Sequence, residues 1–227
     1  MTNRELKNKY QIFLDEYSSS YHKGALEYIR ENFWKCRNSF EIPDILMQVY
    51  SELGLYDDKT DIYLKHLNKI KSIFNIDCNV LEVAGGMLPA FSNIVAREQL
   101  NIGKGTITMY DPMLATTKSK YTNLKLHKKE FTNITDISNY DLIIGILPCD
   151  VTEDIIRKSC IERKNFYIQM CGCTHFTPKQ IMEYGLSREI YQKYIIDLAS
   201  NLLGEEINIT KIDNKFGIDY PILYKKF

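Results

Sequence analysis

The chain has 227 residues, of which 44% are hydrophobic and 26% charged, and these proportions exclude a fully disordered protein. Lys plus Arg and Asp plus Glu both number 29, so no net charge would gather phosphate backbones or anionic lipid, and we expect no extended nucleic-acid surface. The first thirteen residues lack the apolar core of a secretory signal, and the longest apolar run, Leu142 to Leu147, is too short to cross a bilayer. We therefore expect an ordered α/β protein in the cytoplasm, away from membranes.

Residues 1–75 have apolar side chains at helical spacing, as in Tyr63, Leu67, Ile70 and Phe74. This periodicity predicts four helices that form an N-terminal helical cap. Such a cap is compatible with a lid over a cleft and with a dimer interface, and the oligomeric state stays open. Residues 76–227 are then predicted to form a second unit.

From residue 78 onward, short apolar runs alternate with helical stretches, which is the pattern of a mostly parallel sheet covered on both faces. The last helix has clear end signals, because Thr177 and Gln180 form a capping box and Gly204 follows its end. Its apolar stripe is predicted at Leu186, Ile190, Tyr194, Leu198 and Leu202. Strands are expected at 79–83, 106–110, 124–127, 142–147 and 166–170, and helices at 88–100, 152–162 and 178–202.

Two further β-prone segments, 207–212 and 222–224, end the chain without a helix between them, so they must pair as an antiparallel hairpin. Alternating β/α units that finish in a hairpin resemble the class I S-adenosylmethionine (SAM) dependent methyltransferases, whose seventh strand is inserted antiparallel. The resemblance implies a Rossmann-like, mixed seven-stranded sheet over residues 76–227 and SAM as the cofactor.

A glycine loop follows the first predicted strand and opens a helix, where only small residues allow a ligand to lie close to the backbone. It resembles the first motif of these methyltransferases, with Ala84 where the family usually has a glycine. The resemblance implies that Glu82, Ala84, Gly85 and Gly86 form the cofactor loop, in which Gly85 and Gly86 surround the amino-acid end of SAM and Glu82 orients the loop or its ligand. The turn that contains Pro89 also resembles that of nicotianamine synthases, which transfer the aminocarboxypropyl group of SAM.

The second predicted strand ends at a carboxylate, Asp111, which is followed by Pro112 and Met113. In nucleotide-binding α/β folds a carboxylate at this position accepts hydrogen bonds from ribose hydroxyls. The alternative is a turn former ahead of proline. By the resemblance, Met113 flanks the adenine and Glu130 and Phe131, after the third strand, lie near the base; the charged string 125–130 is otherwise a solvated edge.

The fourth strand breaks at Leu147 and Pro148, and the resemblance implies that this strand end faces the methyl donor. Asp150 is a candidate general base if it is buried. The favoured alternative is a helix N-cap formed by Asp150 with Glu153.

Cys149, Cys171, Cys173 and His175 form a further candidate group, provided that the fifth strand continues far enough to align the last three on one face. They could bind zinc, or His175 could activate a cysteine as a thiolate nucleophile. Packed thiols are favoured because the spacing is not that of common zinc knuckles, so we predict no metal. Tyr21, beside a serine-rich break, is a candidate residue of a lid over the substrate.

These observations predict a SAM-dependent methyltransferase, a transferase whose acceptor is a small molecule. One alternative is aminocarboxypropyl transfer, and a second is a binding or regulatory protein that keeps the fold without transfer activity. A nicotinamide dehydrogenase is disfavoured because the loop lacks the Gly-x-Gly-x-x-Gly pattern.

Overall fold

The computed structural model describes residues 60–86, 89–114, 117–119, 121–132, 134–185, 187–213 and 220–227. The predicted helices before residue 60, together with Tyr21, lie outside these ranges. The elements follow in the order α4 (Thr60–Ile73), β1 (Asn79–Val83), α5 (Ala90–Ile102), β2 (Thr106–Tyr110), β3 (Leu124–His127), β4 (Leu142–Ile146), η1 (Cys149–Val151), α6 (Thr152–Ile161), β5 (Asn165–Gln169), α7 (Pro178–Tyr184), α8 (Arg188–Leu203), β6 (Asn208–Thr210) and β7 (Ile222–Lys225).

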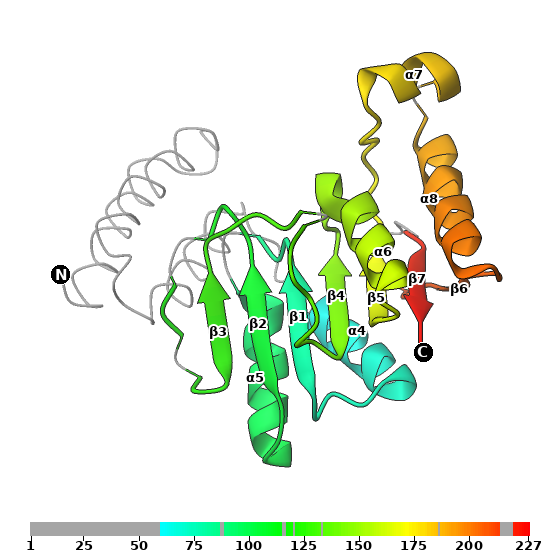
Figure 1. Cartoon of the computed structure of the whole chain (residues 1–227). Coiled ribbons are helices and arrows are strands. Elements are labelled where there is room, and N and C mark those ends of the chain that lie inside the picture. The colour runs from blue at the N-terminus through cyan, green and yellow to red at the C-terminus, as the bar shows by residue number, and fades with distance from the viewer. Residues whose placement is uncertain are drawn as a thin grey trace.

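One seven-stranded sheet forms the centre of the molecule, with the strand order β3-β2-β1-β4-β5-β7-β6 (Figure 1). The first five strands pair in parallel. Strand β7 pairs antiparallel with both β5 and β6, so it lies between them. The predicted mixed Rossmann-like sheet and its C-terminal hairpin are therefore confirmed.

Helices cover both faces of this sheet. This arrangement matches the strand sequences, whose side chains are apolar on both faces and are buried by the helices. Val80 and Ile107 point into a core that includes residues of α4 and α5. Leu81 and Ile143 point into a second core with residues of α6 and α8. The two layers fix the sheet from both sides, so the carboxyl ends of its parallel strands are held as one edge.

Helix α4 belongs to this α/β core, although its sequence lies within the segment that was expected to form the cap. Leu67, Ile70 and Phe74 are buried in the same cluster as the sheet residues, as their periodicity predicted. His66 Nδ1 lies 2.9 Å from the hydroxyl oxygen of Tyr167 on β5. Burial of this ring lowers the pKa of His66 to about 4, because desolvation disfavours the imidazolium.

The helix predicted over 178–202 is two helices, α7 and α8. The predicted capping box at Thr177 and Gln180 is present and starts α7. That helix ends at Gly185, which has φ +83°, a conformation that glycine adopts without the steric cost of a side chain. Ser187 then caps a new helix by accepting a hydrogen bond from the backbone N–H of Ile190.

The predicted apolar stripe of this helix is confirmed only in part. Tyr194 and Leu198 are half-buried and pack against the core. Ile190 and Leu202 are 41% and 37% exposed. The buried face of α8 consists of Tyr191, Ile195 and Ala199, each one residue further along from a predicted position. The centre of the buried face is therefore one residue away from the predicted stripe, and Tyr194 and Leu198 lie at its border.

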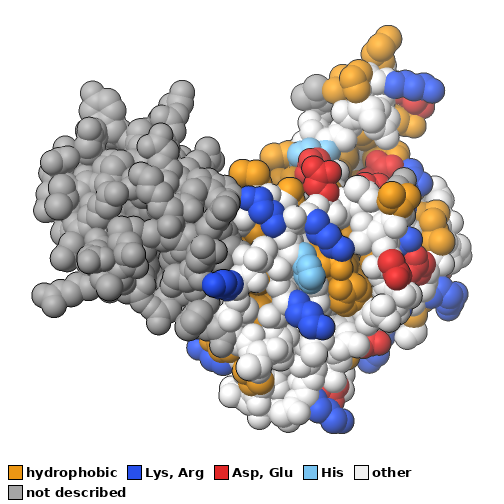
Figure 2. All heavy atoms as spheres, turned by 60° about the vertical axis from the view of Figure 1, so that its left-hand side comes forward, with side chains coloured by type: hydrophobic (Ala, Val, Ile, Leu, Met, Phe, Trp, Pro, Cys, Tyr) orange, Lys and Arg blue, Asp and Glu red, His pale blue; other side chains and the backbone are white. Residues whose placement is uncertain are grey.

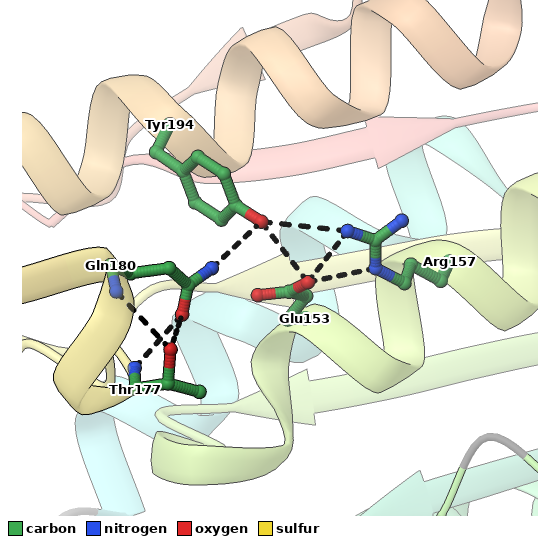
Figure 3. A network of polar contacts seen from close by, with 5 residues as sticks. All are labelled: Glu153, Arg157, Thr177, Gln180 and Tyr194. Atoms are coloured by element: carbon green, nitrogen blue, oxygen red, sulfur yellow. Dashed lines mark hydrogen bonds and ion pairs between the residues drawn. The ribbon is translucent and has the colours of Figure 1, made fainter. Parts of the chain in front are cut away.

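A polar network ties α6, α7 and α8 together (Figure 3). The Tyr194 hydroxyl donates to Glu153 at 3.1 Å and accepts from Gln180 Nε2 at the same distance. Arg157 forms an ion pair with Glu153 at 2.7 Å, one helical turn away on α6. Glu153 is therefore held by Tyr194 and Arg157 rather than by a helix cap.

The β3 edge of the sheet carries basic side chains. Lys125 and His127 are exposed and alternate with buried leucines along β3. Figure 2 shows Lys and Arg side chains spaced around a histidine on the face turned forward. Lysines on an edge strand oppose pairing with a strand of another molecule. Residues 125–127 of the charged string 125–130 therefore form a solvated edge of the sheet.

Candidate functional site

The glycine loop leaves β1 through two residues with left-handed backbone. Ala84 has φ +56° and Gly86 has φ +88°. The N–H of Ala84 donates to the carbonyl of Tyr110 at 2.9 Å, which extends the pairing of β1 with β2 by one step. The loop thereby turns sharply at the end of the strand and presents its backbone at the edge of the sheet.

Asp111 holds this loop against the end of β2. Its Oδ2 accepts a hydrogen bond from the N–H of Gly86 at 2.7 Å, and its Oδ1 accepts one from the N–H of Met113 at 2.6 Å. The side chain is buried, with 5% of its surface exposed. A carboxylate has about four lone-pair sites, so about two remain for a ligand. Asp111 is thus more than a turn former ahead of Pro112.

Glu82 lies beneath the loop. Its carboxylate accepts a hydrogen bond from the hydroxyl of Ser92 on α5. Burial is the main cause that raises the pKa of Glu82, the negative charge of Asp111 adds to the shift, and the Ser92 hydrogen bond opposes it. The net result is a pKa of about 7. A Cβ atom at Gly85 would come within 2.7 Å of Glu82 Oε1 and of Met109 Cε, so the buried carboxyl group requires glycine at this position.

A cleft of about 510 Å³ opens at the carboxyl ends of β1, β2 and β4. All the predicted cofactor-binding residues line it except Glu82, which lies beneath the loop, and Gly85, which belongs to the loop and faces Glu82. Figure 1 shows the strand ends meeting at this edge. The predicted residues that line the cleft are Ala84, Gly86, Asp111, Pro112, Met113, Glu130, Phe131, Leu147 and Pro148.

The wall of the cleft near Glu130 includes an aromatic ring on β2. Phe131 is 3% exposed and belongs to the core, whereas Met113 is 55% exposed. Lys129 Nζ lies 3.7 Å from the centroid of the Tyr110 ring. A cation over this ring fixes the direction of the segment that carries Glu130 and Phe131.

Sequence reasoning did not identify three of the residues that line the cleft, Val83, Tyr110 and Val151, as binding residues. Val83 and Tyr110 are the last residues of β1 and β2, and Val151 lies in η1. The side chains of Val83 and Tyr110 belong to apolar runs, which predict burial rather than ligand binding. The signal that could have identified Val83 and Tyr110 is their place at a strand end, next to Ala84 and Asp111.

Asp150 does not form the expected helix cap. The residue at the N-cap of α6 is Val151, and no side-chain hydrogen bond caps this described helix. Asp150 lies in the short 3₁₀ helix η1, is exposed, and lines the cleft. Because it is exposed, the burial that a general base at this position requires is absent.

The cysteines come together in a different way from the one expected. Strand β5 ends at Gln169, so the alternation of residues 171, 173 and 175 along a strand does not apply. Cys171 is buried, whereas Cys149 and Cys173 are exposed, and the packed-thiol interpretation fails for these two. The ligand atoms of Cys149, Cys171 and His175 lie within 4.8 Å of one another.

The electrostatics of these thiols do not favour a nucleophile. Desolvation raises the pKa of Cys149, and it raises the pKa of Cys171 to about 11. A thiol with a raised pKa stays protonated at neutral pH, and the thiolate is the reactive form. The hypothesis of a cysteine activated by His175 therefore loses its physical basis in the protein without a ligand.

A second hollow, of about 580 Å³, lies along α8 and includes Arg157, Tyr184 and Lys193. It is away from the carboxyl ends of the strands and has no glycine loop in its wall among the described residues. Ligands of open α/β sheets bind outside the carboxyl ends of the strands. The cleft at β1, β2 and β4 is therefore the candidate functional site.

Comparison with known proteins points to the same fold. No protein-family model matches the sequence, and no curated protein is similar to it. Among solved structures, a mutant of MtNAS in complex with S-adenosylmethionine is similar over 92% of this chain and 76% of its own, with a TM-score of 0.51 and 10% identity. The chain therefore shares the Rossmann-like α/β fold of this structure.

Two further solved structures are similar to the chain. One is a SAM-dependent methyltransferase from Aquifex aeolicus, with 12% identity, a TM-score of 0.49, and coverage of 75% of this chain and 94% of its own. The other is the SAM-dependent methyltransferase SibL in its apo form, with 9% identity, a TM-score of 0.47, and coverage of 95% and 72%.

No described helix is both long and apolar enough to traverse a lipid bilayer.

Proposed function

We propose that the chain binds SAM in the cleft at β1, β2 and β4 and transfers its methyl group to a small-molecule acceptor. The observation that carries this proposal is Asp111, a buried carboxylate at the end of β2 that both fixes the glycine loop and keeps lone pairs for a ligand. When bound, SAM supplies an electrophilic methyl group on a sulfonium.

The residues of the cleft fit this cofactor. The ribose hydroxyls have acceptors in the free lone pairs of Asp111. The loop at Ala84 and Gly86 gives the amino-acid end a backbone surface with little side-chain bulk. Met113 and Phe131 give the adenine apolar neighbours. An acceptor would enter beside Leu147 and Asp150, where in-line positioning is the main requirement of methyl transfer.

Aminocarboxypropyl transfer is the second candidate function. It is favoured by the similarity to MtNAS, at a TM-score of 0.51, together with the proline at the start of α5. The two reactions break different bonds of the same sulfonium. Methyl transfer leaves S-adenosylhomocysteine, whereas aminocarboxypropyl transfer leaves 5′-methylthioadenosine.

Isothermal titration calorimetry of the full chain with S-adenosylhomocysteine tests the proposal. We expect one binding site, and we expect no heat with NAD⁺ as the control ligand, because the loop lacks the dinucleotide pattern. The chain would then be incubated with SAM and a panel of small thiols, amines and phenols. Release of S-adenosylhomocysteine supports methyl transfer, and release of 5′-methylthioadenosine supports the second candidate. No heat and no thermal stabilisation with either SAM or S-adenosylhomocysteine would overturn both.

A further inference from the structure

The ends of β4 and β5 bring together three metal-binding side chains that the cleft chemistry does not use. Cys149 lies in η1 after β4, and Cys171 and His175 lie in the segment between β5 and α7. These residues are 22 or more positions apart across the two strands, so only the parallel pairing of β4 with β5 brings them together. We propose that Cys149, Cys171 and His175 form a Zn²⁺ site with an open fourth position.

The distances suit a tetrahedral ion. With Zn–S near 2.3 Å and Zn–N near 2.0 Å, tetrahedral angles separate a sulfur and a nitrogen ligand by about 3.5 Å. Cys171 Sγ lies 3.5 Å from Nε2 of His175. Every pair of the three ligand atoms is within 4.8 Å.

Local backbone structure supports each side of the cluster. Leu147 and Cys149 both have left-handed backbone, with φ of +56° and +49°, so the chain doubles back after β4 and turns Cys149 toward β5. On the other side, a side chain at Gly172 would collide with the Tyr220 ring, which packs against the segment after Cys171. The N–H of Leu147 donates to the carbonyl of Gln169 at 3.0 Å, and this hydrogen bond holds the two segments together where the strands end.

The donor set selects the ion. Two thiolates and one imidazole are soft or borderline ligands, which zinc accepts and which magnesium and calcium do not. Three protein ligands with a fourth position open to a small molecule are characteristic of catalytic zinc sites. Cys149 also lines the proposed cofactor cleft, so the open position faces the space where an acceptor would enter.

Metal analysis of the full chain, purified without chelator from zinc-supplemented cells, tests the site. We expect zinc close to equimolar with the chain, and loss of most of it in Cys149→Ser. Cys149 is exposed, so this variant keeps the fold. Replacement of zinc by Co²⁺ should give the visible and near-ultraviolet bands of tetrahedral cobalt with thiolate ligands, and Cys149→Ser should lose them.

Two other cysteines provide matched controls. Cys78 lies before β1, away from the cluster, and Cys78→Ser should keep the full zinc content. Cys173 is exposed and outside the group of three, so Cys173→Ser should keep it as well. Loss of zinc in Cys173→Ser would overturn the open fourth position. Zinc far below equimolar, without a cobalt spectrum, would overturn the site. SAM binding is measured separately, so failure of the metal site is distinguishable from failure of the proposed function.

Discussion

The two halves of the strand edge are built differently. At the ends of β1 and β2, Glu82 and Asp111 each have hydrogen-bond donors within the protein, from Ser92 and from the backbone of Gly86 and Met113. At the ends of β4 and β5, Cys149 and Cys171 lie beside His175 as neutral thiols with raised pKa values.

This difference teaches how each half prepares for a ligand. The carboxylates at β1 and β2 fix the loop before a ligand arrives, so binding there does not have to order the backbone. The thiols at β4 and β5 lack donors of that strength, and a metal ion would supply the interaction that deprotonates them. The first half is organised by hydrogen bonds, whereas the second places two thiols and one imidazole close enough together to share a metal ion.

The largest expected effect tests the buried charge in the first half. Burial raises the pKa of Glu82 from 4.5 to about 7, so the folded protein holds a proton that the unfolded chain has released. Stability contributed by this group is therefore lost as the pH rises through the window from 4.5 to about 7, and no further loss follows above it. Between these limits, the free energy of unfolding should fall by about 3 kcal/mol relative to Glu82→Gln.

Urea denaturation of the two proteins at several pH values measures this difference. Gln keeps an oxygen for the Ser92 hydroxyl, so the variant is matched in its hydrogen bond. Parallel pH profiles for the two proteins would show that Glu82 does not titrate in this window.

The next effect concerns Asp111 and the cofactor. Asp111→Ala removes two backbone hydrogen bonds and the ligand's acceptor, and it should weaken S-adenosylhomocysteine binding by about 2 to 3 kcal/mol, or about 30- to 150-fold. Asp136→Ala is the matched control, because Asp136 accepts an N–H two residues ahead, from Ser138, but does not line the cleft. Calorimetry should give the control the wild-type affinity. An equal loss of affinity in both variants would show that Asp111 does not bind the ribose.

The smallest effect separates two reasons for glycine in the loop. Gly85→Ala drives a methyl group into Glu82 and Met109, and overpacking of this kind costs about 1 to 3 kcal/mol of stability. Gly86→Ala meets no described atom within 4 Å, so its cost is that of the left-handed backbone, about 1 kcal/mol. Thermal unfolding should rank the two variants in this order. The reverse order would mean that Glu82 moves aside easily.

Sequence reasoning predicted most of the first half of the strand edge. β1, β2 and β3 have the predicted bounds, and the glycine loop and Asp111 lie where the strands end. These are local signals, because an apolar run, a glycine pair and a carboxylate all lie within a few residues of one another. What could not be predicted is that Asp111 reaches back to Gly86, since that contact spans 25 positions.

The sequence by itself determined the parallel β/α units, through the alternation of elements, and the hairpin that must pair antiparallel. It also determined the capping box at Thr177, because Gln180 is one turn away. Only the tertiary structure decided the break at Gly185 and the burial of Tyr191, and only it brought Cys149 to Cys171 and His175. The physical reason is that periodicity and caps act over one or two turns, whereas helix phase against the sheet and the meeting of strand ends depend on packing between distant segments.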